Sequence, residues 1–153
     1  MKLEIRKFKE EDAEDFCNLV KRNLNEVNSK DYPEEVIRFM CNLFSPEKTI
    51  EVSKKKSIYV AIKNNRMAGT DTIDKNEILV VFVNPDLHGK GTGTKIMKHL
   101  EDIAKKNGYE SVKLYSSITA YEFYKKLGYK KLKEVYRKGF GKGILMEKSI
   151  IDG

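Results

Sequence analysis

Apolar and polar residues alternate at the start of the chain and then take up a helical spacing. Residues 3–8 alternate as a half-buried strand does. Between residues 13 and 27 the apolar side chains recur every three or four positions, which predicts an amphipathic helix. Pro33 suits the first position of a second helix, because its missing N–H would have no intrahelical acceptor there. A short further segment begins at Ser45 and ends in the lysine run 54–56.

The middle of the chain predicts three strands. Residues 57–62 and 67–73 are expected to be strands joined through Asn64 and Asn65, because this pair favours a hairpin turn. Residues 77–83 are apolar after Glu77. An edge strand would alternate, so we expect this third strand to be central in the sheet and covered on both faces.

The second half of the chain predicts a strand, a helix and a strand in succession. The helix has its apolar face at residues 96–104 and ends at Gly108, and residues 111–115 form the next strand. Such an order favours a parallel βαβ unit with a right-handed crossover. Thr119 and Glu122 have the spacing of a capping box, which predicts a short helix ending at Gly128. Residues 129–136 and 144–150 are expected to be two closing strands.

Size and composition favour one domain over residues 1–153, since this length is close to that of a typical domain. The N-terminus has no apolar stretch like that of a signal peptide, and the longest apolar run, residues 78–83, is too short to cross a bilayer. We therefore expect a cytoplasmic protein that does not bind membranes.

Cys17 and Cys41 fall in helical apolar stripes and are expected to be reduced packing residues, not a disulfide or a metal pair. We expect no metal ion.

The formal net charge of +7 favours acidic partners. Phosphates, nucleic acid and an anionic cofactor all fit a basic protein. A lysine-rich solvated surface fits the same number, so charge does not decide between these alternatives.

A glycine-rich loop carries the clearest chemical signal. It reads His88-Gly89-Lys90-Gly91-Thr92-Gly93 and joins a buried strand to a helix. The first N–H groups of a helix have no intrahelical acceptor, and the helix dipole favours negative charge there. The loop is therefore predicted to cradle a phosphate. A dinucleotide fingerprint would need glycine where Ile96 stands, and the Gly-Lys-Ser/Thr end of a P-loop is missing as well.

Two motifs together resemble those of the GNAT acetyltransferase superfamily. The loop is similar to that family's signature of Gln or Arg, two residues, Gly, one residue, then Gly or Ala, with His88 departing from its first position. The segment from Ala120 to Tyr129 is similar to the family's Ala-x-x-Phe-Tyr-x-x-x-Gly-Phe/Tyr motif. Both lie in the family's order, and the resemblance covers the chain from about Met67 onward.

The resemblance implies an α/β (α+β) fold. The sheet would be mixed and mostly antiparallel, with six to seven strands around a central parallel βαβ unit and about four helices on both faces. It also implies an N-acetyltransferase that moves an acetyl group, or a larger acyl group, from acetyl-CoA to the amine of an acceptor. The acceptor, a small molecule or a protein amino group, is not readable from the sequence, and homodimers are frequent in the family.

The same resemblance implies roles for individual residues. Tyr124 would be the general acid for the departing thiolate, or alternatively a core tyrosine bonded to a carbonyl. Glu77 would be a general base or an ordinary strand-end carboxylate. A backbone N–H near Val81 would stabilise the oxyanion, and Ser117 would either contact the cofactor or cap a helix. The implied cofactor-binding residues are Val81, Phe82, Val83, His88, Gly89, Lys90, Gly91, Thr92, Gly93, Thr94, Ser117 and Tyr124.

Two alternatives remain open at this stage. Lysines and aromatic residues interleave between residues 124 and 142, as in a nucleic-acid-binding module, but Lys142 stands where an RNA-recognition strand motif needs an aromatic residue. We therefore expect nucleic acid not to be the partner. The other alternative is a CoA-binding sensor without catalysis.

Overall fold

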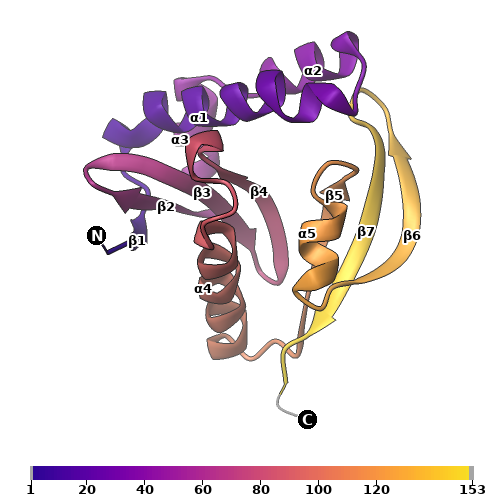
Figure 1. Ribbon diagram of the computed structural model, residues 1–153. Helices are drawn as coiled ribbons and strands as arrows, with labels where there is room; N and C mark the ends of the chain where they lie inside the picture. Colours follow the sequence, from indigo (N-terminus) through magenta and orange to yellow (C-terminus); the bar gives the residue numbers. More distant parts are fainter. Residues whose placement is uncertain (1, 152–153) are drawn as a thin grey trace.

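The computed structural model of the chain describes residues 2–151 and contains a seven-stranded sheet in the order β1-β2-β3-β4-β5-β7-β6 (Figure 1). All neighbouring strands are antiparallel except β4 and β5, which are parallel. The strands are β1 (Glu4–Lys7), β2 (Ser57–Lys63), β3 (Arg66–Asp74), β4 (Glu77–Val83), β5 (Ser111–Ser117), β6 (Lys130–Arg137) and β7 (Gly141–Ser149).

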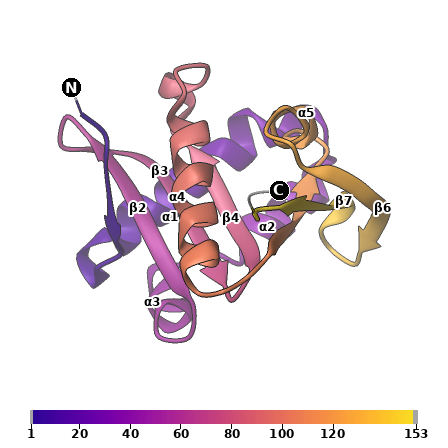
Figure 2. The ribbon, with the colours of Figure 1, turned by 90° about the horizontal axis from the view of Figure 1, so that it is seen from below.

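Helices cover both faces of the sheet (Figures 1 and 2). The α-helices are α1 (Ala13–Glu26), α2 (Glu34–Cys41), α3 (Pro46–Ser53), α4 (Thr92–Lys106) and α5 (Tyr121–Lys126), and the short 3-10 helices are η1 (Glu10–Asp12), η2 (Asn28–Lys30) and η3 (Pro85–Leu87). Seen from below, α4 lies across β2–β4, with α1 to α3 behind the sheet (Figure 2). The predicted mixed sheet with one parallel βαβ unit and helices on both faces is confirmed.

The amphipathic stripes expected from the sequence form two cores. Ile96, Leu100 and Ala104 of α4 are fully buried in the larger core, together with residues of the sheet. On the opposite face of the sheet, Phe16 and Val20 of α1 are buried in the second core. Cys17 lies within this second core and Cys41 packs against it, so both are packing residues, as the sequence predicted.

The ends of the elements follow local chemistry, with one wrong prediction. Asn64 and Asn65 adopt φ of 53° and 61°, the left-handed conformation that a tight hairpin turn requires. Pro33 precedes α2 as its N-cap residue, one position before the predicted place. No capping box opens α5, because Thr119 Oγ1 donates to Asp31 (2.7 Å) instead. The N–H of Ala120, just before α5, donates to Ser117 Oγ (3.1 Å).

β4 is central, as predicted, but it is not covered on both faces. Only Ile78 is buried along this strand, and its other residues are half-buried. Its apolar run reflects a cavity beside the strand, because residues that line a cavity are as apolar as residues within a core.

A buried carboxylic acid lies between the sheet and α4. Asp71 of β3 is fully buried, and neither of its carboxyl oxygens has a hydrogen-bond partner among the described residues. It is paired in register with Tyr59 of β2, whose ring meets that of His99 of α4 at 4.8 Å between centroids. Burial raises the pKa of Asp71 to about 8, since an ionised carboxylate would lose its hydration there.

We expect this acid to make stability depend on pH. The pKa of Asp71 is higher in the folded state than in the unfolded state. The contribution of its protonated form to the unfolding free energy is therefore fully present below pH 4 and is lost as the pH rises towards 8. Between pH 5 and 8 the wild type should lose about 1–3 kcal/mol more unfolding free energy than Asp71→Asn. Denaturant unfolding at both pH values measures the difference. Burial lowers the pKa of His99, so His99 changes the unfolding free energy with pH in the opposite direction. Both proteins contain His99, so its effect cancels in the comparison. Equal pH slopes would contradict this expectation.

Candidate active site

β4 and β5 separate after a short parallel ladder. Their pairing is limited to Glu77 with Lys113 and Ile78 with Leu114, and the two strands diverge beyond it (Figure 1). β4 also holds one extra residue opposite β3, since Thr72 pairs with Leu79 but Thr70 pairs with Phe82. The main chain of β4 beyond Ile78 therefore lacks a strand partner on the side of β5.

The bulge puts strain at the point where the strands part. Val80 has φ of +42°, which a β-branched residue adopts only at an energetic cost. Such strained conformations persist where the surrounding structure imposes them, and they cluster at functional sites. The bulge redirects the N–H and C=O groups of the neighbouring Val81, the residue predicted to supply an oxyanion donor.

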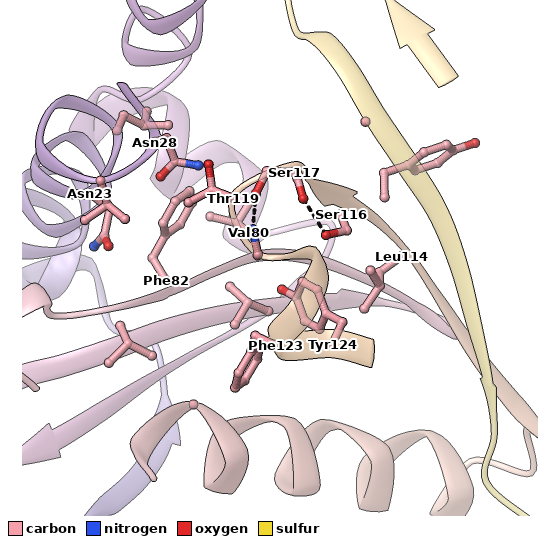
Figure 3. A pocket seen from close by; sticks show the side chains of 18 of the residues that line it. Asn23, Asn28, Val80, Phe82, Leu114, Ser116, Ser117, Thr119, Phe123 and Tyr124 are labelled. Atoms are coloured by element: carbon pink, nitrogen blue, oxygen red, sulfur yellow. Dashed lines mark hydrogen bonds between the residues drawn. The ribbon is translucent and has the colours of Figure 1, made fainter. Parts of the chain in front are cut away.

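A cavity of about 830 Å³ opens between the diverging strands (Figure 3). One end of it is lined by the glycine loop, its middle by β4, β5 and α5, and its other end by α1, α2 and the β6–β7 turn. Of the predicted cofactor-binding residues, the cavity brings together Val81, Phe82, Val83, His88, Gly89, Gly91, Thr92, Gly93, Thr94, Ser117 and Tyr124.

The glycine loop presents unpaired main-chain donors to this cavity. Gly91 is the N-cap of α4 and has φ of +81°, a conformation that glycine adopts without steric cost. Five N–H groups have no acceptor among the described residues, those of Gly89, Gly91, Thr92, Gly93 and Thr94. A cluster of unpaired donors at the positive end of a 15-residue helix has the geometry of an anion site.

Lys90 lies apart from the other loop residues. Its N–H donates to the carbonyl of Leu87 (3.3 Å), and it lines a small hollow on the surface together with Lys63 and Arg66. The structure therefore does not place Lys90 in the lining of the main cavity, in contrast to the flanking glycines.

Side chains fix the loop from both sides. His88 Nε2 donates to the carbonyl of Val83 (2.9 Å), because a carbonyl oxygen only accepts. Arg22 of α1 donates to Asp86 (2.9 Å) and to Asn84 (3.2 Å), and its guanidinium holds the pKa of Asp86 below its usual range. Sequence reasoning missed Arg22, since nothing in a helical charge pattern points to partners 62 and 64 residues away.

Tyr124 lies beside the bulge with its hydroxyl unpaired. The residue is only 7% exposed, and its ring packs against those of Phe123 and Tyr129. Its Oη has no hydrogen-bond partner among the described residues and points toward the β4 side of the cavity (Figure 3). Burial raises the pKa of this phenol well above its ordinary value, so the hydroxyl stays protonated and can donate.

Neither Ser117 nor Glu77 offers a free side-chain group to the cavity. Ser117 lines the cavity, but its hydroxyl accepts from the N–H of Ala120 and so caps the turn before α5. Glu77 begins β4, opposite Asp74, whereas the cavity lining on this strand starts only at Ile78. The structure therefore does not bring Glu77 to the other predicted site residues.

Comparison with known proteins identifies the family. The family model described as the acetyltransferase (GNAT) domain matches residues 18–150. The chain belongs to the GNAT acetyltransferase family. The family resemblance predicted from the two motifs is thereby confirmed.

Individual proteins share part of the sequence or the fold of this chain. An uncharacterized N-acetyltransferase of Methanocaldococcus jannaschii is 36% identical over 90 residues, which cover 57% of this chain and 39% of that relative. A GCN5-related N-acetyltransferase structure from Rhodopseudomonas palustris has a TM-score of 0.90 at 22% identity, covering 97% of this chain and 96% of the other. The PaiA N-acetyltransferase of Thermoplasma acidophilum, solved with coenzyme A, has a TM-score of 0.81 at 25% identity, covering 97% and 99%.

A tyrosine that sequence reasoning missed joins the two halves of this GNAT domain. Tyr32, in the segment between α1 and α2, accepts a hydrogen bond from the N–H of Ile118 (2.8 Å). Its hydroxyl also donates to the carbonyl of Lys142 (2.6 Å). One phenol thus links the helical side of the cavity to β5 and β7. The only sequence signal is a lone aromatic residue before Pro33.

We expect Tyr32→Phe to lower stability by about 1–3 kcal/mol, because it leaves the N–H of Ile118 and the carbonyl of Lys142 without their partner. Denaturant unfolding measures the loss. Tyr121→Phe is the matched control, since the Tyr121 hydroxyl has no hydrogen-bond partner in residues 2–151. Equal stability of the two variants would show that the link contributes nothing.

Among the helices of residues 2–151, none combines the length and apolar character that crossing a bilayer requires.

Proposed function

We propose that this GNAT chain transfers an acetyl group from acetyl-CoA to a primary amine, with Tyr124 as general acid. One observation carries the proposal. The unpaired N–H groups at the start of α4, the bulge of β4 and the Tyr124 hydroxyl all line one cavity. A diphosphate held by the loop would leave the arm of the cofactor to run along β4 towards Tyr124.

The residues present suit this cofactor. The N–H groups of Gly91, Thr92 and Gly93 are free to bind phosphate oxygens, and the helix dipole adds to the attraction. Beyond Ile78, the unpaired edge of β4 can hydrogen-bond the amide groups of an extended arm, as a sheet edge binds an added strand. Side chains from β4, β5 and α5 supply an apolar channel around that arm.

The chain's own groups can then assist the transfer. Bound acetyl-CoA supplies the thioester carbonyl that an amine attacks. A main-chain N–H at the bulge, near Val81, donates to the oxygen on which negative charge develops. Tyr124 Oη delivers its proton to the sulfur as the C–S bond breaks, and the phenol regains a proton through water from the attacking amine. Burial keeps the hydroxyl protonated between turnovers at neutral pH.

Proton removal from the amine falls to water. None of the described residues lining the cavity is an aspartate or a glutamate, and Glu77 lies outside that lining. The acceptor must therefore react in its neutral form without a carboxylate base. We expect kcat/KM to rise with pH until it reaches the pKa of the acceptor amine, since only the fraction of neutral amine reacts.

An acetyl-CoA thiol-release assay over an amine library tests the proposal, with thermal unfolding in CoA as the control for binding. Stabilisation by CoA together with thiol release that depends on an amine is the expected result. Stabilisation without release from any amine would favour a sensor instead. Absence of CoA binding, combined with salt-dependent RNA binding, would favour a nucleic-acid-binding module.

A further inference from the structure

The cavity end away from the glycine loop has an apolar wall. It is built from α1, α2, the segments that follow these two helices, part of β4 and the turn between β6 and β7. This part of the cavity is left for the acceptor when the loop holds a diphosphate. Its apolar lining includes Leu24, Val27, Met40, Phe44 and Phe82. A ligand here would have to bury an apolar group to gain affinity.

One cation in this end lacks an ionic partner. The Arg137 guanidinium stacks on the rings of Tyr115 and Phe140, each at 4.6 Å from the ring centroid, and forms no ion pair within the described chain. The nearby Lys142, by contrast, pairs with Glu134 at 3.3 Å. Stacking holds the guanidinium plane in position while leaving its N–H groups free to bind a planar carboxylate.

A neutral polar group in the same region is also unpaired. Asn28 is 7% exposed, lines the cavity and has no side-chain hydrogen bond to any described residue. Asn23 donates from its amide nitrogen to the carbonyl of Leu19 (3.0 Å), which leaves its Oδ1 without a partner in residues 2–151. Both side chains extend from the helical side towards the strands (Figure 3). The Asn28 amide faces the cavity and is free to hydrogen-bond a polar group of a ligand.

The charge of the lining excludes one class of acceptor. A polycation would lose the hydration of its charges in this cavity and would need carboxylates to compensate for that loss. No aspartate or glutamate lines the cavity within residues 2–151. Arg137 would repel additional positive charge. The α-amino group of a short peptide also suits a site without a carboxylate base. Its pKa of about 7.7–8.0 leaves more neutral amine than the value of about 10.4 for lysine.

We infer that the acceptor is an α-amino carboxylate with an apolar side chain, such as an apolar amino acid or a short apolar peptide. Its carboxylate binds Arg137, its side chain packs on the apolar wall, and Asn28 hydrogen-bonds its polar backbone. This inference rests on the proposed acetyl transfer and goes further by naming the class of substrate.

The test compares phenylalanine, phenylalanine amide and spermidine in the thiol-release assay, with wild type, Arg137→Gln and Lys133→Gln. With kcat/KM divided by the fraction of neutral amine of each substrate, we expect wild type to prefer phenylalanine over its amide and over spermidine by at least about tenfold. Arg137→Gln should abolish the preference for the carboxylate while leaving the KM for acetyl-CoA unchanged. Lys133 is exposed on the same strand and does not line the cavity, so Lys133→Gln should behave as wild type.

Several outcomes would overturn the inference. A preference for spermidine, or a loss on Arg137→Gln that is equal for phenylalanine and its amide, would refute the carboxylate contact but leave acetyl transfer standing. A raised KM for acetyl-CoA in Arg137→Gln would assign the guanidinium to the cofactor. If CoA binds but no amine at all releases thiol, the proposed function fails, and the acceptor class fails with it.

Discussion

Gly91→Val is expected to weaken acetyl-CoA binding by at least about 100-fold. The N-cap position at Gly91 has φ of +81°, and a β-branched side chain would force the loop out of that conformation. The N–H groups that follow would then no longer converge. Hydrogen bonds to a charged ligand contribute about 1.5–3 kcal/mol each, so losing two of them accounts for the expected change.

Gly108→Val is the matched control for this experiment. Gly108 follows the other end of α4 with φ of +89°, and, like Gly91, it has open space where a Cβ would stand. Both substitutions therefore carry a similar cost in backbone strain, about 1–3 kcal/mol. Only Gly91 belongs to the donor cluster. Calorimetric titration with acetyl-CoA separates the two effects, and wild-type affinity in Gly91→Val would refute the phosphate cradle.

Periodicity predicted the architecture well because each element has one buried face. The stripe of α4 and the alternation of residues 3–8 both mark sides that pack on the sheet. Where the prediction was wrong, tertiary contacts outweighed local rules. Thr119 has capping-box spacing, but an acceptor 88 residues away, Asp31, takes its hydroxyl hydrogen. An apolar run likewise could not distinguish a covered strand from one that lines a cavity, as β4 does.

For the site, the sequence was informative wherever main-chain conformation decides. The glycines of the loop marked the free N–H groups, since only glycine adopts the required left-handed conformation at Gly91 without strain. Contacts between distant segments left no such signal. Arg22 and Tyr32 act through partners on other elements, and Asp71 owes its raised pKa to burial by other elements. A sequence pattern shows only their residue types.

The acceptor end illustrates the same limit. The lysines and aromatic residues between positions 124 and 142 suggested a nucleic-acid surface, but the fold divides them among different surroundings. Tyr124 is buried beside the bulge, Lys142 is paired with Glu134, and Arg137 stacks on two aromatic rings. The basic and aromatic pattern along the chain therefore does not place these three side chains on one surface.

Tyr124→Phe is expected to lower turnover by about 100-fold while acetyl-CoA affinity is retained. The hydroxyl has no partner within residues 2–151, so its removal breaks no internal hydrogen bond and should leave stability unchanged. A value at the low end of the usual range for general acids is expected, because a thiol of pKa about 8.5 already leaves readily.

Tyr129→Phe is the matched control. It shows whether the loss of turnover in Tyr124→Phe comes from the missing proton donor or from removing a hydroxyl from any buried tyrosine. Tyr129 packs on the Tyr124 ring at 5.8 Å, but its hydroxyl donates to Glu101 (2.8 Å) and it does not line the cavity. We therefore expect Tyr129→Phe to lower the unfolding free energy and to keep wild-type turnover, the reverse of Tyr124→Phe. Steady-state kinetics with a saturating acceptor, together with thermal unfolding, measures both. Unchanged turnover in Tyr124→Phe would show that this tyrosine is not the general acid, because phenylalanine has no proton to donate.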